Sequence, residues 1–282
     1  MAKKPTPAPV HHRPERRRIA GFGWRPDLPD ARDHYFAVGP KTMGKLPPHV
    51  DLRPKCPPVY DQGQIGSCTA NAIAAAVEMA RKKAGQKPRF MPSRLFIYYN
   101  ERVIEGTVNT DAGAQIRDGI KSIAKAGVCA EKLWPYDDTP ASSDGDIWPK
   151  GAKPATKPPK AAYDAALEHQ AVQYQRVMPM LAQMKGCLAE GNPFVFGFTV
   201  YASLYDDKGA PRKNVPMPGP KDRMLGGHAV LCVGYDDATQ HFVVRNSWGP
   251  KNQDKGYFYL PYSYLTDSDL SDDFWVVKQV EQ

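Results

Sequence analysis

The spacing of apolar and polar residues changes about halfway along the chain. Residues 69–85, TANAIAAAVEMARKKAG, join small and apolar residues to a late Arg-Lys-Lys run and a closing glycine. This pattern predicts a buried helix whose cationic end suits the helix dipole. Residues 93–106 and 112–127 are predicted as further helices, each ended by glycine. The first half of the chain is therefore expected to be mainly helical.

The second half places short apolar runs between Gly, Asp and Asn, a pattern typical of strands joined by turns. Short helices are predicted at 163–170 and 179–191, and the Pro-, Ser- and Lys-rich residues 134–160 are expected to cross the surface. The fold class expected is α+β, with a mainly antiparallel sheet in the second half. The predicted strands are residues 171–177, 193–201, 227–236, 241–249, 256–265 and 272–280.

Residues 1–45 differ from the rest because they are rich in proline and charge, and they are predicted to be extended and weakly structured. The basic start, MAKKPTPAPVHHRPERRR, is not followed by an apolar stretch, which argues against a cleavable secretory signal. No apolar run is long enough to span a membrane. Localisation stays open between the cytoplasm and export by a non-classical route.

The net charge of +8 is concentrated at the N-terminus, since residues 1–18 hold six basic residues against one acidic residue. The remainder is only mildly basic, and no pattern of alternating aromatic and basic residues accompanies the tail. A flexible solvated tail is therefore expected, and no nucleic-acid partner.

The five cysteines form no CxxC pair and no spacing that would build a zinc site, so no metal or other cofactor is implied. Cys187 and Cys232 lie in apolar runs typical of buried residues. Cys56 and Cys129 lie beside turn residues, and a disulfide between them is left open. Only Cys68 follows a glycine-containing loop, QGQIGSC, at the start of a predicted helix.

A cysteine in the first turn of a helix gains from the partial positive charge of the free backbone N–H groups, which favours the nucleophilic thiolate. Such a thiolate needs a base, and His228 begins a buried-looking strand after two glycines. Downstream, Asn246 could orient the imidazole and Trp248 could cover it from water. Gln62 could donate a hydrogen bond to a developing oxyanion, together with the Cys68 backbone N–H.

Each of these residues taken singly has an ordinary structural explanation, but their joint order resembles that of the papain-like cysteine peptidases. The resemblance covers residues 46–282. LPPHVDLR is similar to the start of the mature enzymes and QGxxGSC to their nucleophile loop. GHAV is similar to their histidine strand, and NSWG followed by GYFYL to their asparagine loop and last strands.

The resemblance implies a role for each matched residue. Gln62 matches the oxyanion glutamine, Cys68 the nucleophile and His228 the general base, while Asn246 matches the orienting residue and Trp248 the shielding tryptophan. Two departures stand out: Ile65 replaces a cysteine of the animal and plant enzymes, and Thr69 replaces the aromatic residue that usually follows the nucleophile.

Three glycines are expected to contact substrate. Gly113, in the sequence DAG, occupies the place of the family's segment whose backbone pairs with substrate. Gly197 and Gly227 are expected to face the pocket for the second residue before the scissile bond, and to leave it wide.

The whole pattern predicts a two-lobed papain-like endopeptidase, expected to be a monomer acting on proteins or peptides through a thioester acyl-enzyme. The helical lobe is expected at about 61–165 and the β-rich lobe at about 166–282. Two alternatives stay open: an acyl- or peptidyl-transferring enzyme on the same triad, and a papain-like binding protein without turnover.

Residues 1–45 precede the family-like domain and are predicted to form a short inhibitory prosegment. The family commonly carries such a segment, laid through the cleft against the direction of a substrate. Phe22, Trp24, Tyr35 and Phe36 are expected to occupy apolar pockets, and the prolines to lower the entropy lost on binding. The alternative is a disordered tail without contact to the cleft.

Overall fold

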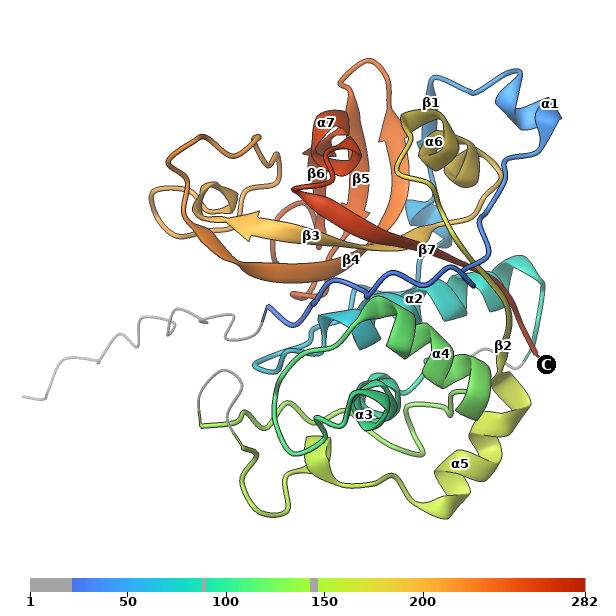
Figure 1. The fold of residues 1–282 in the computed structure, drawn as a ribbon, viewed down its shortest axis with the longest axis vertical. Coiled ribbons are helices and arrows are strands. Elements are labelled where there is room, and N and C mark those ends of the chain that lie inside the picture. The colour runs from blue at the N-terminus through green and yellow to red at the C-terminus, as the bar shows by residue number, and fades with distance from the viewer. Residues whose placement is uncertain (1–21, 88–89, 143–146, 282) are drawn as a thin grey trace, which may run out of the picture.

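The computed structural model describes residues 22–87, 90–142 and 147–281, and the predictions made for residues 1–21 lie outside this range. Four helices form one lobe below the sheet in Figure 1: α2 (Cys68–Lys83), α3 (Arg94–Glu105), α4 (Ile116–Ala126) and α5 (Lys160–Ala166). Helix α2 is buried along most of its length, and it packs against both the sheet and the other two long helices. Its alanines permit this close approach on every side.

The other lobe is a seven-stranded antiparallel sheet in the order β2-β7-β3-β4-β5-β6, with β1 paired to β4. The predicted α+β class, with helices first and an antiparallel sheet after them, is confirmed. Short helices α1 (Pro40–Met43), α6 (Leu181–Ala189) and α7 (Tyr262–Thr266) lie with this lobe in Figure 1. The strands are β1 (His49–Asp51), β2 (Ala171–Arg176), β3 (Phe194–Tyr201), β4 (Met224–Asp236), β5 (His241–Arg245), β6 (Tyr257–Pro261) and β7 (Ser271–Val280).

Several element boundaries differ from the predictions: β5, predicted at 241–249, ends at Arg245, and β4, predicted from 227, begins at Met224. The run 256–265 is a strand only as far as Pro261, which serves as the N-cap of α7. Helix α4 begins at Ile116, four residues later than predicted at 112. The reason is that Gly113 has a positive φ of 65°, and that Ala114 pairs its backbone with residues 23 and 25. These residues therefore form an extended edge before the helix starts.

All five cysteines are free. Cys187 and Cys232 are fully buried in the main core, as predicted. The disulfide left open between Cys56 and Cys129 is not formed. Cys56 lies near the Met79 sulfur, whereas Cys129 belongs to a separate apolar cluster in the helical lobe.

From Phe22 to Val38 the N-terminal segment runs along the sheet and the helical lobe, without a helix (Figure 1). Residues 22–27, here called the covering segment, lie between the helical lobe and the sheet. Residues 33–38, the anchor segment, run beside β2, where the Phe36 N–H donates to the Arg176 carbonyl at 2.8 Å and the Arg176 N–H to the His34 carbonyl at 2.7 Å. Phe36, expected in an apolar pocket of the cleft, is instead buried in the main core beside β2, and Tyr35 is 57% exposed and fills no pocket.

Candidate active site

Cys68 is the first residue of α2 and is fully buried where the helix meets the sheet. The backbone N–H of Ala229, on β4, donates to its sulfur at 3.4 Å. The preceding loop is fixed from the opposite side, because the Gly66 N–H donates to the Asp111 carboxylate at 3.0 Å. The structure thus joins a thiol on one lobe to the strand that carries His228 on the other.

His228 and Asn246 lie side by side, as the sequence predicted, with Nε2 and Oδ1 2.9 Å apart. The Asn246 amide is oriented by its other contacts: Oδ1 accepts from the Ser247 N–H at 2.8 Å, and Nδ2 donates to Gln253 Oε1 at 2.8 Å. An oxygen facing the ring assigns the proton to Nε2. Nδ1 is then the basic nitrogen, and it is buried without a hydrogen-bond partner among the described residues.

Gln62 is buried and ties the nucleophile loop to the loop after β5. Its Oε1 accepts from the Ser247 hydroxyl at 2.6 Å, and its Nε2 donates to the Ile65 carbonyl at 3.1 Å. A side-chain amide has two N–H groups, so one donor stays available after these contacts.

Trp248 stacks on the His228 ring, with centroids 4.9 Å apart and planes inclined by 24°. Phe22 of the covering segment meets both rings edge-on, at 6.2 Å from His228 and 6.5 Å from Trp248. The imidazole is therefore screened from water on one side by Trp248 and on another by Phe22 of the covering segment.

The covering segment pairs its backbone with both lobes. Ala114 donates to the Gly23 carbonyl at 2.7 Å and accepts from the Arg25 N–H at 3.1 Å, while the Trp24 N–H donates to the Gly227 carbonyl at 2.9 Å. A Cβ at Gly113 would fall on the Gly23 backbone, so this glycine allows the close approach. Trp24 and Ala114 form a parallel bridge, and the direction of the segment is therefore fixed.

The Trp24 ring lies in a pocket on the face of the paired strands β3 and β4, where Gly197 and Gly227 leave room for it. A Cβ on either glycine would collide with the indole ring. At the end of the pocket, the fully buried Asp273 accepts the indole N–H at 3.0 Å and the Asp27 N–H at 2.7 Å through the same oxygen. The two glycines thus lie together, as predicted, but the buried carboxyl that completes the pocket was not foreseen.

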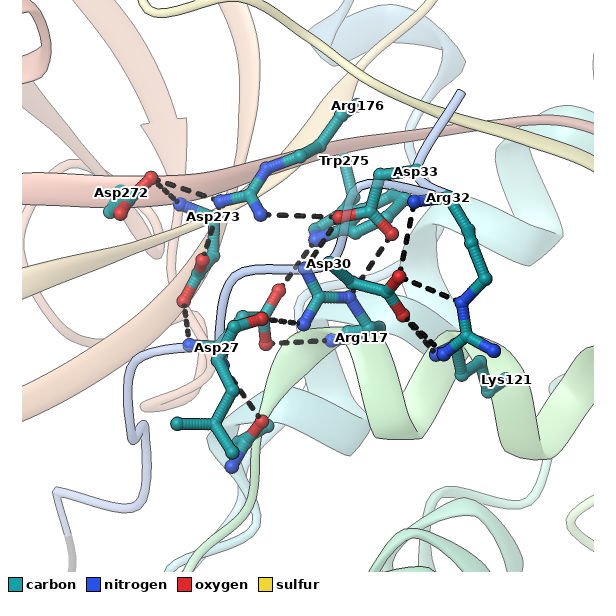
Figure 2. A network of polar contacts seen from close by, with 12 residues as sticks. Asp27, Asp30, Arg32, Asp33, Arg117, Lys121, Arg176, Asp272, Asp273 and Trp275 are labelled. Carbon is teal, nitrogen blue, oxygen red and sulfur yellow. Dashed lines mark hydrogen bonds and ion pairs between the residues drawn. The ribbon is translucent and has the colours of Figure 1, made fainter. Parts of the chain in front are cut away.

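Beyond this pocket the segment enters a network of charged residues, shown in Figure 2. Asp33 pairs with Arg117 of α4 and, at 3.4 Å, with Arg176 of β2. Arg176 also binds Asp273 at 2.8 Å, which connects the anchor segment to the Trp24 pocket. Burial, together with the nearby charge of Asp27, raises the pKa of Asp273 above its ordinary value.

Burial of the site shifts the pKa values of both Cys68 and His228. It raises the pKa of Cys68 to about 12 against the opposing effect of the N–H groups of Ala229, Gly23 and Thr69. It lowers the pKa of His228 to about 4. The sequence predicted a stabilised thiolate. In this covered state the neutral thiol and neutral imidazole are favoured instead, because desolvation exceeds the effect of the helix terminus.

Three contributors escaped the sequence analysis: Gln253, Asp111 and Asp273. Gln253 stands in a polar stretch whose pattern is that of any surface turn, Asp273 lies at the start of a predicted strand, and Asp111 was noted only as part of the sequence DAG. Nothing in their spacing indicates that they orient Asn246, the nucleophile loop and Trp24, respectively.

The fold and the site define a class of protein. The model of the papain family cysteine proteases matches residues 46–272, and the chain belongs to this family. It is a papain-like cysteine protease and hence a hydrolase. The predicted family and two-lobed fold are confirmed.

Individual proteins similar to this chain support the same family assignment. The crystal structure of xylellain, a cysteine protease from Xylella fastidiosa, is 50% identical, with a TM-score of 0.90 over 95% of this chain and 99% of that one. An uncharacterised peptidase C1-like protein of Acanthamoeba polyphaga mimivirus is 38% identical, over 92% of this chain and 87% of its own length. Procathepsin B from Trypanosoma congolense, 18% identical, shares the fold with a TM-score of 0.67 over 86% and 80% of the two chains.

Among residues 22–87, 90–142 and 147–281, no helix combines the length and the apolar character needed to cross a bilayer.

Proposed function

We propose that the protein is an endopeptidase that cleaves peptide bonds through Cys68, His228 and Asn246. The observation that carries the proposal is the buried hydrogen bond between His228 and Asn246. His228 lies on β4, and the next residue of this strand, Ala229, donates its backbone N–H to the Cys68 sulfur. Because Asn246 holds the proton on Nε2, His228 Nδ1 is left to exchange a proton with the thiol. Gly113, Gly197 and Gly227 are proposed to contact the substrate.

The reaction follows from these positions. His228 takes the proton of Cys68, and the thiolate attacks the peptide carbonyl, whose oxygen is stabilised by the Gln62 amide and the Cys68 N–H. His228 then gives the proton to the leaving amine, and a thioester acyl-enzyme forms. Water, deprotonated by His228, attacks the thioester, and the acid product and the free thiol are released.

The covering segment is proposed to inhibit this reaction in two ways. Phe22, Gly23 and Trp24 occupy the space that a substrate needs, by pairing with Ala114 and Gly227. The same residues exclude water, and the pKa of Cys68 rises to about 12 while that of His228 falls to about 4. The ion pair of thiolate and imidazolium would then form only after the segment leaves and water enters. The predicted prosegment is retained in this narrower form.

Loss of hydrolysis in Cys68→Ala and in His228→Ala, with unchanged circular dichroism, tests the proposal. Cys187→Ala is the matched control, because this buried thiol lies in α6, outside the site. Gln62→Ala is expected to lower kcat by about 10²-fold, the usual scale for one oxyanion donor. Near-normal turnover by pure Cys68→Ala protein would exclude this mechanism.

Two assays separate the proposed activity from its alternatives. The first assay labels Cys68 with iodoacetamide or an epoxide and measures turnover of a peptide. Labelling together with turnover would exclude a binding protein that has no activity. Analysis of the products with added amines separates hydrolysis from acyl transfer, because a transferase would form the amide in preference to the free acid.

A further inference from the structure

Directly behind Cys68 lies a buried carboxyl group that the proposed reaction does not use. Glu101, on α3, is fully buried, and its Oε1 accepts the hydroxyl of Thr69 at 2.6 Å. Thr69 is also fully buried and is the residue that follows the nucleophile. A hydrogen bond between two buried side chains of different helices therefore fixes the first turn of α2 to α3.

The other oxygen of this carboxyl, Oε2, has no hydrogen-bond partner among the described residues. It faces Gly119 of α4, where an added Cβ would lie only 2.6 Å from it. The three helices of the lobe thus converge on Glu101, and the absence of a side chain at Gly119 makes the room. A carboxylate with one unpaired oxygen in such a site would be costly, which favours the neutral acid.

The link reaches the sulfur through the backbone. The backbone N–H of Ala229 donates to the Cys68 sulfur from the sheet lobe at 3.4 Å. On the helical lobe, Cys68 and Thr69 are consecutive residues in the first turn of α2. The hydrogen bond from Thr69 to Glu101 therefore ties the turn that carries the sulfur to α3.

We propose that Glu101 is a positioning residue for the reaction, because its hydrogen bond to Thr69 holds the first turn of α2, which begins with Cys68. The inference rests on the proposed function, and it names a residue that acts only through another. This role also gives a reason for Thr69, at a position where papain-like peptidases usually have an aromatic residue.

Charged groups from each adjoining element affect Glu101. Burial raises its pKa to about 8; Arg102 of α3 and Arg25 of the covering segment oppose this rise, and Asp118 of α4 adds to it. Arg102 does not pair with it, since its guanidinium binds the carbonyls of Val108, Thr110 and Pro154. Above about pH 8 the carboxylate forms, and its negative charge raises the pKa of Cys68.

The first test measures the hydrogen bond. Thr69→Val keeps the shape and removes the hydroxyl, and kcat for a small peptide is expected to fall about threefold to tenfold at pH 7, the scale of one hydrogen bond, with KM unchanged. Thr69→Ser should restore kcat. An unchanged kcat for Thr69→Val, or a loss that only follows the fraction of folded protein, would overturn the proposal.

The second test measures the charge. The rate of Cys68 alkylation by iodoacetamide is followed from pH 6 to pH 10 in the full chain and in Glu101→Gln. The covering segment is common to both chains, so the ratio of their rates reports on the thiol. This ratio should change severalfold around pH 8 in favour of Glu101→Gln. Asp164→Asn, on an exposed helix face, removes one negative charge throughout this pH range and should show no such step.

The outcomes are distinguishable from failure of the proposed function. Alkylation needs no turnover, so a step near pH 8 would support the role of Glu101 even if the protein hydrolysed nothing. A flat ratio in a chain that does hydrolyse peptides through Cys68 would exclude the role of Glu101 and leave the peptidase assignment standing.

Discussion

The two parts of the N-terminal segment are held by different kinds of contact. The covering segment, residues 22–27, is held by backbone hydrogen bonds to Ala114 and Gly227 and by one large side chain, Trp24, which lies in a pocket ending in the Asp273 carboxyl. The anchor segment, residues 33–38, contributes Phe36 and Val38 to the main core. Between them lies an exposed stretch that includes Leu28, 71% exposed.

This difference indicates that the covering segment and the anchor segment have different roles. A core side chain such as Phe36 stabilises the fold, because its removal leaves a cavity. The backbone contacts of the covering segment, by contrast, are of a kind that another extended peptide can make in its place. We propose that the segment is a removable cover at one end and a structural element at the other, although the boundary expected from sequence placed all of residues 1–45 outside the catalytic domain.

The largest expected effect is on stability. Phe36→Ala should lower the free energy of unfolding by about 3–5 kcal/mol, the scale for removing a buried phenylalanine. Denaturation by urea measures it, and Tyr35→Ala, at a 57% exposed neighbour, is the control. If both variants lost equally little stability, residues 33–38 would be a cover like residues 22–27, and the comparison would fail.

The next effect is on activity. Trp24→Ala should raise kcat/KM of the full chain on a small peptide by up to about a hundredfold, because truncating a buried aromatic residue weakens docking of the covering segment. The melting temperature should change less than in Phe36→Ala. Leu28→Ala, in the exposed stretch, is the control. Equal kcat/KM for the variant and the uncut wild type would mean that the segment does not inhibit.

A smaller effect isolates the polar contact in the pocket. Trp24→Phe keeps an aromatic ring but removes the N–H that Asp273 accepts at 3.0 Å. The expected gain in kcat/KM is about tenfold, since a hydrogen bond to a carboxylate contributes roughly 1.5–3 kcal/mol. Steady-state kinetics at pH 7 measures it. A gain as large as that of Trp24→Ala would show that the ring contributes nothing by itself.

The smallest expected effect is a shift along the pH axis. Burial raises the pKa of Cys68 to about 12 in the covered state, so its alkylation should keep accelerating with pH beyond pH 9. In Trp24→Ala, water reaches the thiol more often, the pKa falls, and the rate should level off at a lower pH. Coincident profiles for the two proteins would argue that the covering segment does not control the thiol.

The ordered motifs carried most of what could be predicted. Cys68, His228 and Asn246 each stand in a short sequence with a local physical reason, and their order along the chain made the family recognisable. Asp273, Gln253 and Glu101 could not be found in the same way. Asp273 and Glu101 act on residues that are distant in sequence, Trp24 and Thr69, and local spacing carries no information about such pairs. Gln253 lies only seven residues after its partner Asn246, but its polar surroundings do not distinguish it from an ordinary turn residue.

The sequence by itself determined the α+β class, the family and the candidate nucleophile, because apolar periodicity and catalytic motifs are local properties. Only the tertiary structure decided where the N-terminal segment lies, which of its aromatic residues are buried, and that Cys68 is held as a neutral thiol. These depend on desolvation and on contacts between the two lobes. A helix terminus favours a thiolate from within one element, but the burial that outweighs it exists only when the segment, the helix and the sheet have come together.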